Sequence, residues 1–277
     1  MSRLSDVQRW HVGEIRVTAL SDGPLPLGVD NLLGIDEETY TDVLRARHSD
    51  PGTWRSGLNA YVVETGGRTV LVDSGCGGAM GPETGRFADN LSAAGFAPGD
   101  IDTIYVTHMH GDHIGGLVSN GAAVFSEATL NVHQDEHAHW TQKDNATEIA
   151  RAVLDLYSNR LVTFTGAAEI APGLTAVPLP GHTPGHCGLE IRSGTETLLI
   201  WTDIVHVAPV QLADPDVGTG FDVDPDAARE TRKRLLDRVA DEGMMIAGSH
   251  IAFPGAGWIE RAEKGYRFVA KRYTHDS

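Results

Sequence analysis

Short apolar runs that end in polar residues recur along the chain and predict β-strands. The runs lie at 14–20, 58–64, 69–75, 102–108, 128–133, 174–180, 197–203 and 244–250. Each is shorter than a typical helix and is bounded by glycine, proline or polar residues, which is the pattern of strands. In four of these strands the polar residue at the carboxyl end is a histidine or an aspartate, or the strand leads directly to one.

Helical patterns separate the predicted strands, at 85–95, 134–141, 146–157 and 224–241. The last of these helices should begin with Asp224 as its N-cap and Pro225 in its first turn. Strands that alternate with helices in two successive halves favour an α/β protein, a four-layer αββα sandwich of two sheets flanked by helices. We expect residues 1–277 to form one domain, because a split would cut through the single site described below.

Residues 21–57 have a different pattern, rich in proline and glycine, with one short helical stretch around 37–47. A connection of this length within a compact domain is usually functional, so we interpret it as a candidate lid over a substrate pocket. A dimer arm is the alternative, and we expect a homodimer. Four leucines would suit such a subunit interface: Leu25, Leu27, Leu32 and Leu33.

The composition excludes several classes of function. A formal net charge of −16 would repel nucleic acid. No run approaches the roughly 18 apolar residues that a membrane helix needs, and the first residues lack the apolar run of a secretory signal, so we expect a cytoplasmic protein that does not bind membranes. Two cysteines, Cys76 and Cys187, are too few for a disulfide framework.

The strongest chemical signal is the segment THMHGDHIGG at 107–116. It follows a predicted strand and offers imidazoles and a carboxylate, which bind divalent metals of borderline softness. The four side chains are His108, His110, Asp112 and His113. A surface histidine cluster is the simpler interpretation, but the apolar strand before the segment and the glycine pair at its end argue against it.

Four side chains on so short a loop cannot all converge on one ion, so we expect two metals. His182, Asp203 and His250, each at a strand end, would supply the remaining ligands, and a carboxylate can bridge two ions. Two metals about 3.5–4 Å apart can share a water, lower its pKa and present a metal-bridging hydroxide as the nucleophile. Asp112 is the candidate catalytic residue, as a proton donor to the leaving group.

These motifs resemble those of the metallo-β-lactamase superfamily. The resemblance rests on HMHGDH, on GHTPGH at 181–186, on the aspartate of WTDIVH, on the histidine of AGSH and on VDSG at 72–75. Within the superfamily, residues 58–273 look similar to methyl parathion hydrolase-like enzymes. Gly111 stands where proline is familiar, Cys187 replaces a common threonine, and we expect no export signal.

The resemblance implies a ligand set and a cofactor. One metal would be held by His108, His110 and His182, and the other by Asp112, His113 and His250, with Asp203 as the bridge. Asp73 would support the metal loop from behind, with a turn cap after the strand as the alternative. The metals would be two divalent ions, zinc first, with iron, cobalt or manganese as alternatives. Four further residues are expected on the wall of the substrate pocket, although core positions are the alternative for each: Trp54, Trp140, His206 and Phe253.

The resemblance also implies hydrolysis of a small-molecule substrate. We expect an aryl ester or a lactone, with N-acyl homoserine lactone as one named example and organophosphate triesters as a promiscuous activity. A β-lactamase or a thioesterase on the same fold is the alternative enzyme. A non-catalytic metal-binding regulatory protein is the alternative of another class.

Overall fold

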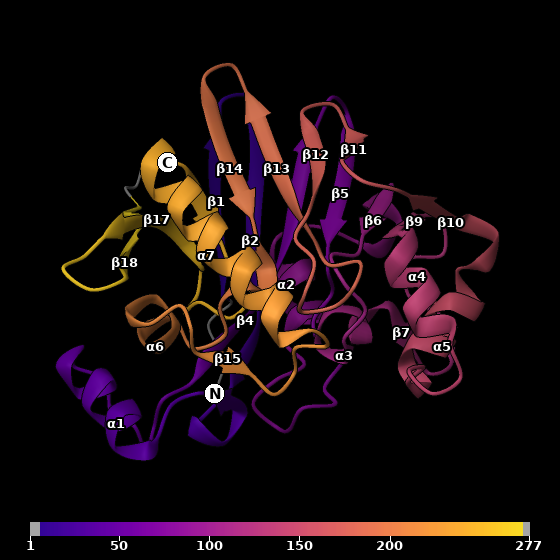
Figure 1. The fold of residues 1–277 in the computed structure, drawn as a ribbon. Coiled ribbons are helices and arrows are strands. Elements are labelled where there is room, and N and C mark those ends of the chain that lie inside the picture. Colours follow the sequence, from indigo (N-terminus) through magenta and orange to yellow (C-terminus); the bar gives the residue numbers. More distant parts are fainter. Residues whose placement is uncertain (1–5, 274–277) are drawn as a thin grey trace.

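The computed structural model describes residues 6–273, and two seven-stranded sheets form its centre (Figure 1). The first sheet is antiparallel through its first four strands and parallel through the rest. Its strand order is β1 (Val7–Val12), β2 (Ile15–Leu25), β4 (Ser56–Thr65), β5 (Arg68–Val72), β6 (Thr103–Tyr105), β9 (Thr129–His133) and β10 (Leu161–Phe164).

The second sheet is built from the other half of the chain. Its neighbouring strands are antiparallel except for the pair β14 and β16, which α7 (Pro225–Glu242) connects and which is parallel. Its strand order is β11 (Ala168–Ala171), β12 (Leu174–Pro178), β13 (Cys187–Ser193), β14 (Glu196–Ile200), β16 (Met245–Ala247), β17 (Ala256–Arg261) and β18 (Tyr266–Ala270).

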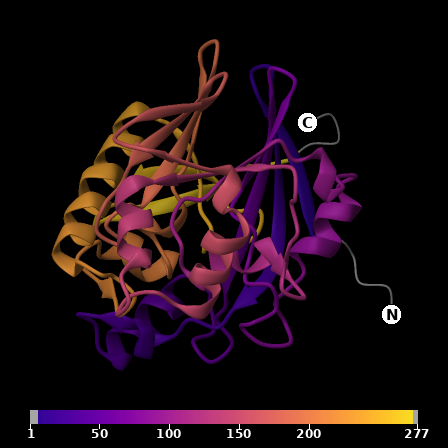
Figure 2. The same ribbon diagram turned by 90° about the vertical axis from the view of Figure 1, so that its right-hand side faces the viewer.

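Helices cover the outer face of each sheet, and Figure 2 shows the two sheets face to face between them. Against the first sheet pack α2 (Phe87–Ala93), α4 (Gln134–Thr141) and α5 (Glu148–Leu156). Against the second packs α7, which begins as expected with the Asp224 carboxylate accepting from Ala227 N. The predicted α/β class and the four-layer αββα sandwich of the metallo-β-lactamase fold are therefore confirmed.

The apolar runs in the sequence follow from this layering, because each central strand is covered on both faces. In β4, Ala60 and Val62 face the helix layer, whereas Tyr61 and Val63 face the second sheet. In the second sheet, Leu199 of β14 turns to the α7 side between two residues that face the first sheet. Alternate side chains thus fill three stacked cores.

The segment predicted as irregular is shorter and more ordered than expected. The strand β2 continues to Leu25, and the connection then contains η1 (Val29–Asn31), β3 (Leu32–Leu33) and α1 (Glu37–Ala46). β3 pairs with β15 (Gly218–Thr219). Of the four leucines expected at a subunit interface, three are buried in a satellite core with α6 (Ala208–Ala213), and only Leu33 is exposed, at 46%.

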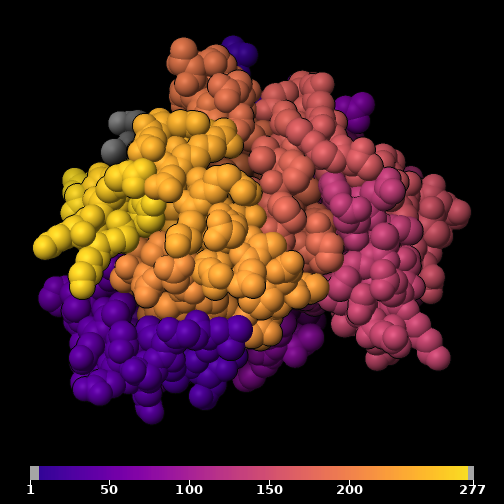
Figure 3. Space-filling view, in the orientation of Figure 1, coloured from indigo at the N-terminus to yellow at the C-terminus, as the bar shows by residue number. Residues whose placement is uncertain are grey.

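The remaining elements are short. They are α3 (Gly111–Ile114), the strands β7 (Val118–Ser119) and β8 (Ala122–Ala123), and the 3-10 turns η2 (Pro98–Asp100), η3 (Gly115–Leu117), η4 (Ser158–Arg160) and η5 (Thr202–Ile204). Within residues 6–273, none of the helices combines the length and the apolar character that crossing a bilayer requires. Figure 3 shows the 21–57 segment lying along one end of the molecule, beside the second half of the chain.

Candidate metal centre

The seven predicted metal ligands meet at one end of the two sheets, on the loops that follow four strands. The loop after β6 carries four of them, and the loops after β12, β14 and β16 carry one each. All but His110 are buried. Close approaches hold the loop after β6 in place: a Cβ on Gly116 would lie 2.1 Å from the carbonyl oxygen of Ser74, so the position requires glycine.

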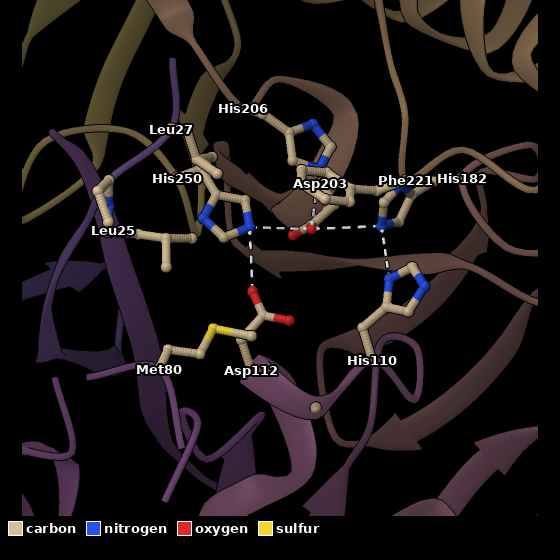
Figure 4. Close-up of a pocket in the computed structure, with 12 residues that line it drawn as sticks. Leu25, Leu27, Met80, His110, Asp112, His182, Asp203, His206, Phe221 and His250 are labelled. Atoms are coloured by element: carbon tan, nitrogen blue, oxygen red, sulfur yellow. Dashed lines mark hydrogen bonds and ion pairs between the residues drawn. The ribbon is translucent and has the colours of Figure 1, made fainter. Parts of the chain in front are cut away.

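Three imidazoles form the first cluster, called here the three-histidine group: His108, His110 and His182. His110 Nδ1 lies 3.1 Å from His108 Nε2 and 2.9 Å from His182 Nε2. Three nitrogens therefore converge on one point, as Figure 4 shows for His110 and His182. Convergent imidazole nitrogens are the donor set that zinc and similar ions prefer.

The second cluster, the four-residue group, contains two carboxylates and two imidazoles: Asp112, His113, Asp203 and His250. Asp203 Oδ1 lies 3.1 Å from His113 Nε2, and Asp203 Oδ2 lies 2.9 Å from His250 Nε2. Asp203 Oδ2 is also 3.4 Å from His182 Nε2 of the three-histidine group. One carboxylate therefore reaches both groups.

Hydrogen bonds behind the histidines fix which nitrogen faces inward. His113 Nδ1 lies 2.8 Å from the carboxylate of Asp73, and His250 Nδ1 lies 3.1 Å from the carbonyl oxygen of Gly57. His182 Nδ1 lies 2.9 Å from Asp222 Oδ1. These acceptors call for a proton on Nδ1, which leaves the three Nε2 atoms unprotonated and free to bind a cation.

Asp73 lies where it was expected, behind the metal loop. Its two oxygens accept from the backbone N–H and the hydroxyl of Thr107, at 2.9 Å and 2.7 Å, as well as contacting His113. Asp73 adopts a φ of 57°, in the left-handed region. Such backbone strain persists where surrounding contacts impose it, as the contacts with Thr107 and His113 do here.

Two further buried carboxylates, Asp222 and Glu136, were not anticipated from the sequence. Asp222 contacts His182, and Glu136 accepts hydrogen bonds from the loops that carry the histidines. Asp222 lies in a loop with no pattern to single it out. Glu136 shares a helical face with Trp140, four residues later, and that apolar partner was a sign that the face is buried.

The pKa values of the buried histidines separate the two groups. Burial lowers the pKa of His110 and of His182 to about 4, so both are neutral near pH 7. Burial also lowers the pKa of His113 and His250, but the adjoining carboxylates, Asp203 first, outweigh it and raise both above the usual value. The carboxylates of the four-residue group therefore favour a positive charge at His113 and His250, which a bound cation can supply in place of a proton.

A cavity of about 340 Å³ opens onto both groups (Figure 4). One wall is polar, with His206 beside the clustered ligands. The other wall is apolar and consists of Leu25, Pro26, Leu27 and Met80, while Phe221 lies beside His206 with ring centroids 6.1 Å apart. Of the described residues that line the cavity, none is a lysine or an arginine. The cavity therefore suits an uncharged molecule with an apolar part.

His206 is the one predicted pocket residue that lines this cavity, and the other three lie elsewhere. Trp54 packs into the satellite core of the 21–57 segment. Trp140 is buried behind His110, its ring centroid 5.4 Å from the imidazole, and Phe253 packs against the core between the sheets. An aromatic residue near a motif is more often core than pocket wall, and that alternative holds for these three.

Several polar atoms at the centre are buried without a hydrogen-bond partner among residues 6–273. They are His113 Nε2, Asp203 Oδ1 and both ring nitrogens of His206. His113 Nε2 lies 3.1 Å from Asp203 Oδ1 and His206 Nε2 lies 3.2 Å from Asp203 Oδ2, but neither approach has the geometry of a hydrogen bond. Buried polar atoms are ordinarily paired, so these atoms mark a place where a ligand or ion belongs. Nitrogen and carboxylate donors in these proportions fit a divalent metal of borderline softness.

Comparison with known proteins is consistent with a metal-binding site at this position. The family model described as the metallo-beta-lactamase superfamily matches residues 54–250. An N-acyl homoserine lactonase of Bacillus thuringiensis is 27% identical over 168 residues, which are 61% of this chain and 63% of the relative. The chain thus spans 63% of the length of the first curated relatives that it matches.

Two solved structures are similar over almost the whole chain. Hydrolase AbOPH, described as a member of the beta lactamase superfamily, has a TM-score of 0.91 and 27% identity, covering 99% of this chain and 100% of that one. AidC, a dizinc quorum-quenching lactonase solved with the product N-hexanoyl-L-homoserine, has a TM-score of 0.90 and 25% identity, covering 98% and 99%.

Proposed function

This chain belongs to the metallo-beta-lactamase superfamily, and on that premise we propose that it is a metal-dependent hydrolase acting on small, uncharged lactones or esters. The observation that carries the proposal is the cavity with two walls. Clustered imidazoles and carboxylates form one wall, apolar side chains form the other, and no cationic side chain stands among the described lining residues. The expected similarity to methyl parathion hydrolase-like enzymes stays a prediction.

The residues that would hold two divalent ions, zinc first, are those of the two groups. The three-histidine group would bind one ion and the four-residue group the other, with Asp203 between them. The unpaired Asp203 Oδ1 and the fixed Nδ1 hydrogen bonds support this assignment. When bound, such ions supply Lewis acidity toward a carbonyl oxygen and make water a nucleophile near neutral pH.

The reaction would be addition of water to the ester or lactone carbonyl carbon and cleavage of its bond to the ring or alkoxy oxygen. Asp112 faces the cavity next to His113 and His250, and despite burial those histidines hold its pKa below the usual range. Asp112 would therefore be ionised and able to accept the proton of the attacking water. Returning that proton to the departing oxygen completes the cycle.

His206 would orient the substrate. Its ring is parallel to that of His250, with centroids 5.0 Å apart, and neither of its nitrogens has a hydrogen-bond partner among the described residues. An imidazole N–H there can donate to the carbonyl oxygen of a bound lactone. Leu27 and Phe221, which also line the cavity, would contact an acyl or aryl group.

The relatives favour a lactone over the other substrates. The curated relative and AidC are both described as lactonases, and the product bound to AidC is an N-acyl homoserine. A β-lactam and a glutathione thioester both carry carboxylates, which the described lining residues offer no cation to pair with. We therefore propose β-lactams and thioesters as poorer substrates than lactones. Hydrolysis of organophosphate triesters is proposed as a secondary activity.

The test is metal analysis combined with a substrate panel. We expect about two equivalents of metal per chain, and hydrolysis that a chelator abolishes and added zinc restores. Across N-acyl homoserine lactones, aryl esters, thioesters, β-lactams and a phosphotriester, kcat/KM should be highest for a lactone or an aryl ester. Full activity in metal-free protein would refute the proposal. Two bound metals with no turnover of any substrate would favour the regulatory alternative.

A further inference from the structure

A carboxylate that touches neither the cavity nor any of the seven clustered residues occupies a central position behind them. Glu136 lies on α4, directly after β9, and is fully buried, with 0% of its surface exposed. Glutamate is almost never fully buried unless its oxygens are paired. The proposed chemistry makes no use of this side chain, so its burial requires another explanation.

Both oxygens of Glu136 are saturated, and each serves a different part of the site. Oε1 accepts from Met109 N at 2.8 Å and from Trp140 Nε1 at 2.5 Å. Oε2 accepts from Thr183 Oγ1 at 2.6 Å and from Gly185 N at 3.1 Å. Four donors facing two oxygens match an ionised carboxylate, which only accepts.

The partners of Glu136 adjoin the three-histidine group. Met109 stands between His108 and His110, and Thr183 directly follows His182. The third partner, Trp140, lies with its ring edge-to-face against His110. One carboxylate therefore connects the two loops that carry the three histidines, which are more than 70 residues apart in the chain.

Backbone packing places the second loop directly against Glu136. A Cβ on Gly185 would lie 2.2 Å from the backbone nitrogen of Glu136, so only glycine allows this approach. The loop can therefore reach the carboxylate without a side chain between them. This close approach of Gly185 to Glu136 sets how near the turn at 181–186 lies to α4.

The four-residue group has its own supports. His113 is held by Asp73, and the carbonyl oxygen of His113 accepts from both the backbone nitrogen and the hydroxyl of Ser74. His250 is held by the carbonyl oxygen of Gly57. None of these contacts involves Glu136, although Asp73 also accepts from Thr107, next to His108.

We propose that Glu136 is a positioning residue that sets the geometry of the three-histidine group, and through it the affinity for one of the two metals only. The inference rests on the proposed pair of metals. Without Glu136, the loop of His110 and the turn of His182 lose their common anchor. Loss of a supporting contact behind a ligand typically costs about 10- to 100-fold in metal affinity.

Glu136→Gln is the decisive variant because it keeps the shape of the side chain. Its single oxygen can satisfy Met109 and Trp140, but its amide group then faces the N–H of Gly185, donor against donor. Zinc affinity is measured by competition with a chromophoric chelator. We expect two equivalents in the parent protein, and in the variant one equivalent weakened about 10- to 100-fold with the other unchanged.

Asp135→Asn is the matched control, because Asp135 is the exposed neighbour of Glu136 on the same helix. Both of its metal affinities should equal those of the parent. Should E136Q not fold by circular dichroism, Thr183→Val decides in its place, since it removes one donor to Oε2 and should weaken the same single equivalent.

A double-mutant cycle identifies the group that is affected. In a His110→Ala background, which disables the three-histidine group, E136Q should not weaken the remaining metal further, whereas Asp73→Asn should. Equal weakening of both metals by E136Q, or of neither, overturns the role of Glu136 and leaves the proposed function intact. A parent protein that binds no metal would instead refute the proposed function.

Discussion

At the scale of single residues, the centre depends on two kinds of side chain. Some point into the centre, and others lie behind them and hold them in orientation. Asp203 is of the first kind, since its carboxylate reaches His113, His250 and the three-histidine group. Asp73 is of the second kind, since it holds the far nitrogen of His113. Removing a residue of the first kind deletes a ligand, whereas removing one of the second kind loosens a ligand that is still present.

The two aspartates should therefore differ on substitution to alanine. We expect Asp203→Ala to lose most metal and essentially all hydrolysis, because both proposed ions depend on it. Asp73→Ala should lower metal affinity about 10- to 100-fold and recover part of its activity at high zinc. Metal content after dialysis and kcat/KM at several zinc concentrations measure both effects. Parental metal content and activity in the Asp203 variant would rule out the bridging role.

His206 allows a test of substrate orientation apart from metal binding. His206→Phe keeps an aromatic ring beside His250 but removes both nitrogens. If the imidazole donates to the substrate carbonyl in the transition state, kcat should fall about 10²- to 10³-fold at unchanged metal content. Steady-state kinetics and metal analysis on the same sample provide the measurement. A variant that loses metal instead would identify His206 as a ligand and contradict the orienting role.

At the scale of elements, the segment after β2 contributes to the cavity through its first turn only. Leu25, Pro26 and Leu27 line the apolar wall, whereas α1 packs away from it against α6. The role of the 21–57 segment as a lid stays a prediction. The exposed large apolar side chain of the segment is Leu33, beside β15.

Leu27→Ala should change substrate ranking. Shortening this side chain removes an apolar contact with the acyl group, so kcat/KM should fall about 10-fold for long-chain lactones and little for short ones. The native mass and metal content should be unchanged. An equal loss for all chain lengths would mean that Leu27 does not contact the substrate.

Leu33→Ser is the companion variant, and the quantity measured for it is the native molecular mass. The expected homodimer predicts dissociation in analytical ultracentrifugation if the exposed Leu33 lies in the interface. A variant with the native mass and the native substrate ranking would exclude Leu33 from both roles.

The sequence predicted helices and strands well where a capping residue and the spacing of apolar residues indicated the same element. The helix at 134–141 has the bounds of α4, and Asp224 caps α7 as expected. Strands with charged outer faces escaped detection: β17 and β18 pair through Glu260 and Arg267, which hid the apolar alternation. The histidines and aspartate of the 107–116 segment were recognisable from their spacing, whereas Glu136 was not, because its partners are brought to it only by the fold.

At the scale of the whole molecule, the centre joins the two sheets. The loop after β6 belongs to the first sheet, and Asp203 and His250 follow strands of the second. Hydrogen bonds across the interface reinforce this junction, such as those from Tyr61 Oη and Asn59 Nδ2 to the carbonyl oxygen of Gly248. A cation held by ligands from both halves would act as a further crosslink.

Metal removal should therefore destabilise the whole fold and not only stop hydrolysis. Ligand present at about 100 times its Kd stabilises the native state by about 2.7 kcal/mol, which for a chain of this size corresponds to a Tm about 5–10 °C higher. Differential scanning calorimetry of zinc-loaded and chelator-treated protein measures the shift. The Asp203→Ala variant is the control: its Tm should hardly respond to the chelator, because it binds little metal. If wild-type protein unfolds at one temperature with and without zinc, the metals do not connect the two halves, and the packing of the two sheets alone sets the stability of the sandwich.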